Sequence, residues 1–377
     1  MPAAILALTP HLDVGEPGRD TLDLARHLRS RGGRPLVASG GGRLVRELAA
    51  SGVAHLQMPL SRPGRLVRWY SSTKLARAIR DHRLDVVHAQ TATLAPVALA
   101  AARAAGVRCV VTLREGAPAD APLDALARAD QLIAVSDFVA DSMAPRLNLP
   151  TTRLRVVRRW IDLAEFDPER VRGHRVSALA ERWGIAPGSR VLLVPPLPDG
   201  DQGHLLLLRA MARLPNTDLI VLFAGAWDPE SRYGRDVVVA ARRAGLAERV
   251  RFGSGMDDLA ATIALADLVA LPATQADPTG FFAVAAQAMG RPVIVSNRGA
   301  LPEAVMPAST GWMVAAGDAD ELAAALGLAL AMDDGPRRRL AVRARAFVAD
   351  EFGLATNADR TLAVYRDLDG TALARAG

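Results

Sequence analysis

The stretch 277–294 combines an acidic side chain, a helix start and a buried strand. Asp277 and Pro278 have loop character, because proline lacks an N–H group and restricts the residue before it. Gly280 then precedes the helix-forming run 281–289, and 292–295 has strand composition. An acidic loop leading into a helix N-terminus of an α/β unit is a good position for an anionic ligand, although an aspartate before proline is equally typical of a simple turn.

A second group of candidate residues is basic and aromatic. Arg62, Arg65, Arg68 and Trp69 lie close together just before an expected helix over 72–82. Arginine beside tryptophan suits an anionic membrane surface, and the same pattern is equally typical of a solvated helix face.

The formal net charge is +6, and Lys74 is the only lysine, so nearly every cation is an arginine. Such a surface suits phosphates or membrane headgroups, whereas biased codon usage would produce the same composition without a function. Because a basic face studded with aromatic residues is missing, no nucleic-acid partner is expected. The single cysteine, Cys109, lies in an apolar run and excludes a disulfide framework or a cysteine-based zinc site, and no metal is expected.

Short apolar runs alternate with helical segments along most of the chain. This alternation predicts parallel sheets with helices on both faces. The expected strands are 3–8, 35–39, 53–58, 85–88, 108–113, 131–135, 191–194, 218–223, 250–252, 268–271 and 292–295. The rhythm breaks over 153–188, and the chain is helical after residue 319.

A chain of 377 residues is too long for one ordinary core, so two domains are expected. The predicted fold class is α/β, with two doubly wound parallel sheets facing a cleft and ligands at the carboxyl ends of the strands. We expect an N-terminal domain over 1–168, a linker over 169–188 and a C-terminal domain over 189–352. A final helix over 353–377 is expected to pack back toward the first domain.

No apolar run reaches the roughly 20 residues that cross a bilayer. Residues 1–9 lack the basic start of a signal peptide and are interpreted as a strand. The expected location is therefore cytoplasmic, with peripheral contact on the inner face of the cytoplasmic membrane as a further interpretation.

Several segments form an ordered set along most of the chain: 21–25, the D-V-V-H strand at 85–88, the I-A-V-S strand at 133–136, the linker 161–168, the helix and strand 286–294, and 310–318. This set resembles glycosyltransferase family 4, the retaining GT-B enzymes. It is closest to members that build lipopolysaccharide core or other cell-envelope sugars.

The resemblance implies two Rossmann-like domains. The C-terminal one would bind a nucleotide-sugar, either a UDP- or a GDP-sugar, and the N-terminal one a glycan or lipid-linked acceptor. The sugar would be transferred with retention of its anomeric configuration. Side chains and helix dipoles would neutralise the donor diphosphate without a structural metal, and no further cofactor is implied.

The family's paired glutamates, which contact the transferred sugar and the ribose, correspond to Asp277 and Ala285. Aspartate keeps the charge on a shorter side chain, whereas alanine cannot accept a ribose hydrogen bond. Loss of such a charged hydrogen bond costs about 1.5–3 kcal/mol.

The family's two diphosphate-binding cations correspond to Leu197 and Gln202, beside Gly203. Asp199 and Asp201 add negative charge to the same loop, which opposes phosphate binding.

Arg114 stands at or near the family's histidine after the fifth strand. Arginine cannot act as a general base, but it can bind phosphate. The resemblance therefore implies a rebuilt site with Asp277 and Arg114 as catalytic residues. The predicted donor-binding residues are Gly15, Arg19, Gln202, Gly203, Gly280, Arg298 and Gly299.

Two functions follow. The first is an active glycosyltransferase with a rebuilt donor site. The second is a catalytically silent GT-B paralogue that assists an active glycosyltransferase partner or binds a glycan, and the joint replacement of four motif positions favours it.

Overall fold

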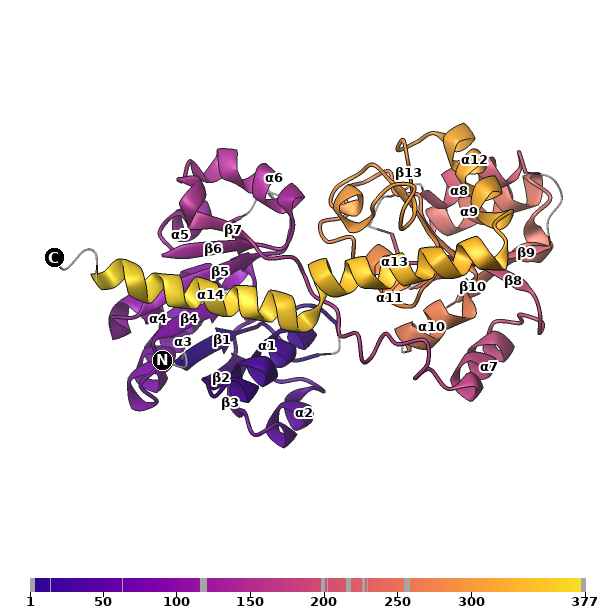
Figure 1. Ribbon diagram of the computed structural model, residues 1–377. Coiled ribbons are helices and arrows are strands. Elements are labelled where there is room, and N and C mark those ends of the chain that lie inside the picture. The colour runs from indigo at the N-terminus through magenta and orange to yellow at the C-terminus, as the bar shows by residue number, and fades with distance from the viewer. Residues whose placement is uncertain are drawn as a thin grey trace. The chain divides into compact units, whose positions relative to one another are not determined.

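The computed structural model describes residues 4–13, 15–62, 64–115, 121–197, 201, 203–214, 218–225, 228, 230–253 and 258–373. The chain forms two compact units, which Figure 1 shows with their labelled elements. Unit 1 consists of Met1–Trp160 and Leu354–Gly377, and unit 2 of Ile161–Gly353.

Unit 1 is built on a parallel sheet that has seven strands within the described residues, in the order β3-β2-β1-β4-β5-β6-β7. The strands are β1 (Ala4–Leu8), β2 (Arg34–Ser39), β3 (Ala54–Gln57), β4 (Val86–Ala89), β5 (Arg108–Leu113), β6 (Gln131–Ala134) and β7 (Leu154–Val156). The helices are α1 (Gly18–Ser30), α2 (Val45–Ala50), α3 (Arg65–Asp81), α4 (Ala95–Ala105), α5 (Leu123–Ala127), α6 (Asp137–Leu147) and α14 (Leu354–Leu373), with 3₁₀ turns η1 (Ala92–Leu94) and η2 (Thr151–Arg153).

The central strand β1 shows why helices cover both faces of this sheet. All five of its residues are buried. Leu6 and Leu8 belong to one hydrophobic cluster, while Ile5 and Ala7 belong to the cluster on the opposite face. Since successive side chains of a strand point to opposite faces, a wholly apolar strand needs cover on both.

The C-terminal helix α14 provides part of that cover, and it lies beside α1 in unit 1 (Figure 1). Its residues Val364, Tyr365 and Leu368 are buried in the same cluster as Ile5. The Tyr365 hydroxyl lies 2.6 Å from Nδ1 of His88, a buried residue on β4. The end of the chain is therefore part of the core of the unit that contains its beginning.

Unit 2 is built on a second parallel sheet, which has six strands in the part of the chain that the structure describes, in the order β10-β9-β8-β11-β12-β13. The strands are β8 (Arg190–Val194), β9 (Leu219–Ala224), β10 (Val250–Gly253), β11 (Leu268–Leu271), β12 (Val293–Ser296) and β13 (Trp312–Val314). The helices are α7 (Gly173–Arg182), α8 (Gly203–Met211), α9 (Arg232–Arg243), α10 (Leu259–Leu265), α11 (Phe281–Ala288), α12 (Ala319–Leu330) and α13 (Asp334–Phe352), with 3₁₀ turns η3 (Ala247–Arg249) and η4 (Leu301–Ala304).

The same alternation organises unit 2. On β8, Val191 and Leu193 belong to one cluster, and Leu192 and Val194 to the other. The prediction of two doubly wound parallel sheets is confirmed, and in both units the loops that follow the strands gather at one edge of a sheet.

The structure differs from the sequence-based expectations in three places. Helix α3 begins at Arg65, so most of the basic segment expected to precede a helix is itself helical. The expected linker 169–188 contains α7, whose Leu179 packs in the core of unit 2, and the boundary between the units falls after Trp160. The short edge strands β7 and β13 were not predicted, because three residues carry too little periodicity to be recognised.

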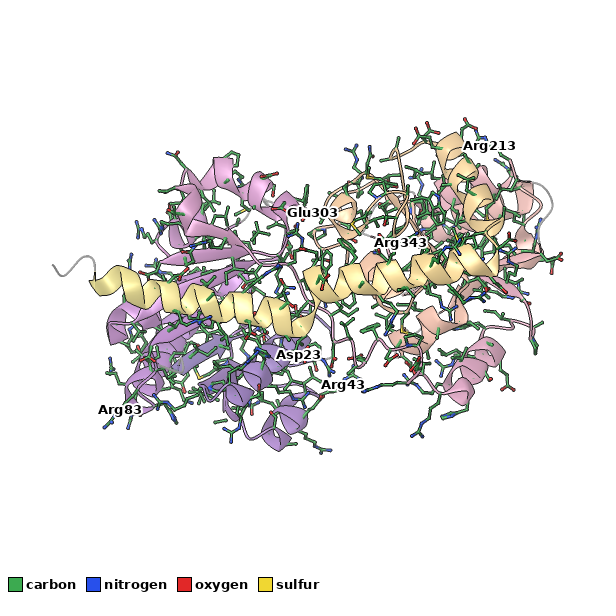
Figure 2. All side chains as sticks on the ribbon, viewed as in Figure 1. Asp23, Arg43, Arg83, Arg213, Glu303 and Arg343 are labelled. Atoms are coloured by element: carbon green, nitrogen blue, oxygen red, sulfur yellow. The ribbon has the colours of Figure 1, made fainter. Side chains whose placement is uncertain are left out.

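Arginine side chains lie on the surfaces of both units, as Figure 2 shows for Arg43, Arg83, Arg213 and Arg343. Among the helices of the described residues, none is both long enough and apolar enough to span a bilayer.

Replacement of Tyr365 tests the attachment of α14. Tyr365→Phe removes a buried hydroxyl that hydrogen-bonds to His88, so we expect the free energy of unfolding to fall by about 1–2 kcal/mol in urea titrations followed by circular dichroism. Tyr70→Phe is the matched control, because Tyr70 is half exposed and its replacement should cost less than about 0.5 kcal/mol. Equal effects of the two changes would contradict a structural role for the Tyr365 hydroxyl.

Candidate functional site

Asp277 lies in the loop between β11 and α11, at the carboxyl edge of the sheet of unit 2. Its Oδ1 accepts hydrogen bonds of 2.8 Å from the backbone N–H groups of both Thr279 and Gly280. Gly280 precedes α11 in the left-handed conformation, with φ +63°. The carboxylate is thus held at the helix N-terminus, and among the described residues Oδ2 has no hydrogen-bond donor.

Gly299 belongs to the next loop, between β12 and η4, and it packs directly against Asp277. A Cβ atom added at Gly299 would lie 2.2 Å from the Asp277 carbonyl oxygen, and φ at Gly299 is +60°. The same carbonyl accepts a 2.7 Å hydrogen bond from Ala300 N. Gly280 is similarly crowded, since a Cβ there would lie 2.9 Å from Cβ of Ala304. The absence of a side chain at these two glycines allows the two loops to pack closely. Their role in donor binding stays a prediction.

Arg298 precedes Gly299 and is exposed. Within the described residues its guanidinium makes no ion pair or hydrogen bond. An unengaged cation therefore adjoins the backbone that carries the Asp277 carboxylate, at the carboxyl ends of two neighbouring strands. A helix N-terminus with an exposed arginine in the neighbouring loop is a suitable position for an anion.

In the loop between β8 and α8, the structure describes 195–197 and Asp201. Leu197 packs against the hydrophobic core. Asp201 is buried, and its carboxylate accepts hydrogen bonds from Gly203 N at 2.6 Å and from Thr274 N and Gln275 N at 2.8 Å. These N–H groups turn the Asp201 carboxylate inward and use its oxygens, and the expectation that Asp201 opposes phosphate binding stays a prediction.

Gly203 begins α8 at a point where the chain has no room for a side chain, since a Cβ would lie 2.5 Å from the carbonyl oxygen of Pro272. Gln202 and Asp199 lie outside the described residues. Next to Gly203, burial lowers the pKa of His204 to about 4, and this neutral ring packs edge-on against Phe223.

Ala285 occupies the middle of α11 and is fully buried in the core of unit 2. Its methyl group replaces the second acid of the family motif with a packing contact. Any donor recognition by unit 2 must therefore use groups other than a carboxylate at this position.

In unit 1, Arg114 follows β5 and forms part of a cluster of four charged side chains, which we call the ion cluster: Glu16, Asp20, Arg114 and Arg159. The Asp20 side chain is 4% exposed, those of Arg114 and Arg159 are 10% and 9% exposed, and that of Glu16 is 31% exposed. Arg114 lies 2.5 Å from Asp20, and Arg159 lies 2.5 Å from Glu16 and 3.3 Å from Asp20. Arg114 also donates to the Gln90 carbonyl at 2.8 Å. The positive charge of Arg114 is thus balanced inside unit 1, and its predicted catalytic role stays a prediction.

Burial by itself would raise the pKa of Asp20, but the guanidinium groups of Arg159 and Arg114 outweigh burial and lower it. Burial, reinforced by Arg114, lowers the pKa of neighbouring His88 to about 3. The region therefore contains charged Asp20 and neutral His88 at physiological pH. Arg159 was missed as a member of this region, because no sequence spacing pairs the segment before Trp160 with the first loop.

Two other predicted donor-binding residues, Gly15 and Arg19, lie in or next to the first loop of unit 1. Arg19 forms ion pairs with Glu47 at 3.3 Å and with Asp23 at 3.5 Å. Gly15 is exposed with open space around it, whereas a Cβ at Gly18 would lie 2.5 Å from the Asp13 carbonyl oxygen. Gly18 is thus the glycine that this loop requires, and the assignment of Gly15 and Arg19 to donor binding stays a prediction.

Two family models match the chain, one for each unit. The model described as glycosyltransferase family 4 matches residues 18–165, and the model described as glycosyl transferases group 1 matches residues 189–332. The chain belongs to glycosyltransferase family 4. The described residues contain no group of three or more histidine, cysteine, aspartate or glutamate side chains that could hold a metal ion.

Among curated relatives, the D-inositol 3-phosphate glycosyltransferase of Mycobacterium marinum is 34% identical over 245 residues, which is 63% of this chain and 50% of the relative. The chain thus spans about half the length of the curated relatives it matches.

Solved structures establish the GT-B fold over 97% of the chain. A glycosyltransferase from Rickettsia africae superposes with a TM-score of 0.85 at 20% identity, covering 97% of this chain and 98% of that one. Anabaena HepE in complex with UDP-glucose superposes with a TM-score of 0.77 at 21% identity, over 97% of this chain and 100% of that one. WaaG, a glycosyltransferase involved in lipopolysaccharide biosynthesis, superposes with a TM-score of 0.68 at 18% identity, covering 94% of this chain and 98% of that one.

Gly299→Ala tests the close approach of the two loops in unit 2. A left-handed alanine costs about 1–2 kcal/mol. Gly188→Ala is the matched control, because φ at Gly188 is +81° and a Cβ there meets no atom within 4 Å. We expect Gly299→Ala to lower the free energy of unfolding by about 1–3 kcal/mol more than the control, owing to the contact with Asp277. Similar urea midpoints for the two variants would show that the loops are not tightly packed.

Asp20→Asn tests the ion cluster. The change leaves two buried guanidinium groups against one carboxylate, so we expect a loss of about 3–5 kcal/mol of unfolding free energy. Asp81→Asn removes an exposed partner of Arg77 and should cost at most about 1 kcal/mol.

The sign of the pH dependence follows from the lowered pKa of Asp20. Its stabilising effect is complete above the ordinary value of 3.8 and is lost as the pH falls below it, so wild type and Asp20→Asn should converge in acid. Denaturation at neutral pH and near pH 3 checks both statements, and a constant difference between the two proteins at the two pH values would contradict them.

Proposed function

We propose that this family 4 chain is a glycosyltransferase that moves a sugar from a nucleotide-sugar to an acceptor hydroxyl with retention of anomeric configuration. The observation that carries the proposal is the close packing of two loops in unit 2: the Asp277 carboxylate is held at the N-terminus of α11, and Gly299, which follows the exposed Arg298, packs against the Asp277 backbone. The acceptor oxygen bonds to the anomeric carbon and the bond from that carbon to the diphosphate oxygen breaks. The hydroxyl proton leaves with the diphosphate.

The donor is a UDP- or GDP-sugar. Support comes from the similarity to Anabaena HepE, whose structure contains UDP-glucose. Arg298 neutralises charge on the departing diphosphate, and the N-terminus of α11 contributes its dipole without a metal ion. Asp277 orients the transferred sugar through Oδ2, because its Oδ1 already accepts two backbone hydrogen bonds.

The acceptor is a cell-envelope glycan or a lipid-linked molecule. WaaG, whose fold this chain shares, acts in lipopolysaccharide biosynthesis, and the curated relatives are named for inositol 3-phosphate. Peripheral membrane contact through Arg62, Arg65, Arg68 and Trp69 belongs to the same proposal. These side chains are exposed in or just before α3, and basic residues near an anionic surface attract it.

A second function has its own support. Leu197 packs on the core, Ala285 is buried in it, and Arg114 is balanced by Asp20. A catalytically silent paralogue, which assists an active glycosyltransferase or binds a glycan, would tolerate all three arrangements. It differs from the first function in not turning over a nucleotide-sugar.

Calorimetry with UDP, GDP and their glucose and mannose derivatives tests the donor site. We expect Arg298→Ala to weaken binding about tenfold to a hundredfold through the loss of a charged contact. Arg338→Ala is the control, since it removes an exposed arginine of α13. We expect Asp277→Asn to lower kcat about 10²–10³-fold with little change in nucleotide affinity, because its role is in the transition state. No binding by wild type at millimolar nucleotide-sugar would overturn the enzyme function and favour the silent paralogue.

A further inference from the structure

Asp201 is a buried acid of unit 2 that has no part in the donor chemistry proposed above. It lies between β8 and α8 and is 3% exposed. Its Oδ1 accepts hydrogen bonds from Gly203 N at 2.6 Å and from the Thr274 hydroxyl at 3.1 Å. Its Oδ2 accepts from Thr274 N and Gln275 N, each at 2.8 Å. Because these donors belong to two loops, one side chain joins the loop after β8 to the loop after β11.

The two loops meet because their strands are neighbours in the sheet. Strands β8 and β11 pair in parallel, with Leu193 opposite Val269, so the loops after them leave the same edge side by side. The backbones are in close contact there, since a Cβ atom added at Gly203 would lie 2.5 Å from the carbonyl oxygen of Pro272. The short side chain of Asp201 is therefore long enough to reach across.

The loop that Asp201 holds is the one that carries Asp277. Asp277 follows Gln275 by two residues, and its own carbonyl accepts a 2.7 Å hydrogen bond from Ala300 N, in the loop after β12. The loop after β11 is thus attached at two points, to Asp201 on one side and to Ala300 on the other. A segment attached at one point can turn about it, whereas two attachments fix its direction.

We propose that Asp201 is a positioning residue for sugar transfer. By holding Thr274 and Gln275 it fixes the direction in which the Asp277 carboxylate presents Oδ2 to the transferred sugar. The proposal rests on the glycosyltransferase function, and Asp201 acts in it only through the loop, without touching the donor. A displacement of a reacting group by about 1 Å lowers a rate about a hundredfold, so a second attachment of this loop has a large effect on the rate.

Asp267 offers a matched control on the same two strands. Its Oδ2 accepts a 2.8 Å hydrogen bond from Val191 N, so it also joins β11 to β8 through a backbone N–H group. Asp267 directly precedes β11, and Val191 is the second residue of β8, which places this contact at the amino edge of the sheet. Asp267→Asn therefore weakens the same pair of strands at the edge opposite to the donor loops.

Transfer of the sugar to water tests the role without knowledge of the acceptor. The water oxygen bonds to the anomeric carbon, the bond from that carbon to the diphosphate oxygen breaks, and a proton from the water leaves with the diphosphate. Release of UDP from UDP-glucose, or of GDP from GDP-mannose, measures the rate with whichever donor binds in calorimetry. The full chain is used throughout.

The expected effect of the substitutions is on kcat. Asp201→Ala should lower kcat about tenfold to a hundredfold and change KM less than about threefold, because the displaced group acts in the transition state. Asp201→Asn should lower kcat less than Asp201→Ala does, since the amide keeps one of the two acceptor oxygens. Asp267→Asn should leave kcat within about twofold of wild type.

A double variant shows whether Asp201 acts through Asp277. A positioning residue has an effect only while the group that it positions is present. In the Asp277→Asn background, Asp201→Ala should therefore change kcat less than about threefold. A side chain that only supports the fold would lower kcat by the same factor in both backgrounds.

Hydrogen exchange measures the loop in the absence of any nucleotide. The amides of Thr274, Gln275, Thr279 and Gly280 all donate hydrogen bonds to Asp201 or Asp277. We expect a peptide covering 272–280 to exchange about tenfold faster in Asp201→Ala than in wild type, and at the wild-type rate in Asp267→Asn. Thermal melting shows whether each variant is folded, and Asp201→Asn serves in both assays if Asp201→Ala is not.

The proposal is overturned if folded Asp201→Ala and Asp201→Asn turn over the nucleotide-sugar as wild type does, or if Asp201→Ala lowers kcat equally in the two backgrounds. It is also overturned if exchange over 272–280 is unchanged in Asp201→Ala, or is raised as much by Asp267→Asn. Wild type that turns over no nucleotide-sugar overturns the glycosyltransferase function and the positioning role with it. That failure is distinguishable from failure of the loop contacts, because the exchange comparison needs no donor.

Discussion

The parallel strands of this protein are apolar on both faces, and most of its structure follows from covering them. Each residue of β1 is buried, and alternate side chains enter different hydrophobic clusters. Helices must therefore lie on both sides of each sheet, so the chain returns to the same edge before every strand. The loops that follow the strands meet at the opposite edge. Asp277, Gly299 and Arg114 occupy positions of this kind because of where their strands end.

Close packing between these loops makes further demands. The loops after β11 and β12 of unit 2 approach so closely that only glycine fits at Gly299. The Asp277 carbonyl accepts a hydrogen bond from Ala300 N, in the next residue. Asp201 joins the β8 loop to the β11 loop by bonding to Thr274 and Gln275. A carboxylate that accepts several backbone N–H groups is stable when buried, and it holds two loops in a fixed arrangement. These backbone contacts fix the loops at the carboxyl edge of the sheet of unit 2, where we propose that the donor binds.

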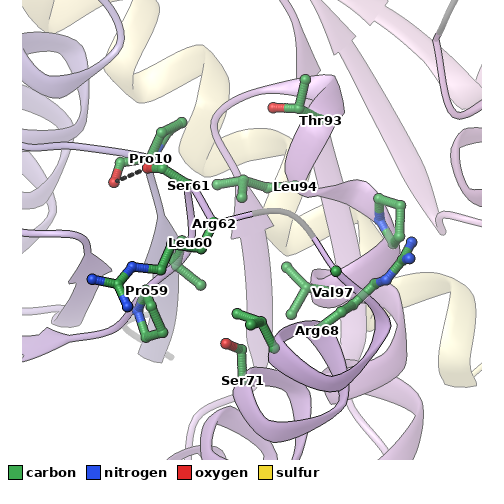
Figure 3. Close-up of a pocket in the computed structure, with 13 residues that line it drawn as sticks. Pro10, Pro59, Leu60, Ser61, Arg62, Arg68, Ser71, Thr93, Leu94 and Val97 are labelled. Atoms are coloured by element: carbon green, nitrogen blue, oxygen red, sulfur yellow. Dashed lines mark hydrogen bonds between the residues drawn. The ribbon is translucent and has the colours of Figure 1, made fainter.

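The arginine side chains of unit 1 occur in two different environments. Arg114 and Arg159 are balanced by Asp20 and Glu16 inside the ion cluster, where removal from water would be costly for any unpaired charge. Arg62 and Arg68 line a pocket with no acid in its wall (Figure 3) and remain in contact with solvent. Residues of the same type therefore serve internal stability in one place and are available for an anionic ligand in the other. Burial and the presence of a nearby carboxylate determine which of the two roles an arginine has.

The sequence by itself determined the class of fold, the positions of the longer strands and the family. Each of these depends on local periodicity or on ordered motifs, and both are readable along the chain. It also placed Asp277 before a helix and Ala285 within one. The sequence did not reveal α7 inside the expected linker or the edge strands β7 and β13, because short elements are stabilised by contacts with distant residues.

Only the tertiary structure decided which charged groups remain available. Asp20, Arg114 and Arg159 are far apart in sequence and meet because their loops share one end of the sheet. The sequence suggested that Asp201 would repel phosphates. In the structure its carboxylate is buried and accepts hydrogen bonds from N–H groups of the loop after β11. Gly18 and Gly299 are required by contacts with distant backbone atoms, which no local pattern reports. Charge balance and close approach are properties of distances in space, and for that reason the sequence could propose these residues but could not assign their roles.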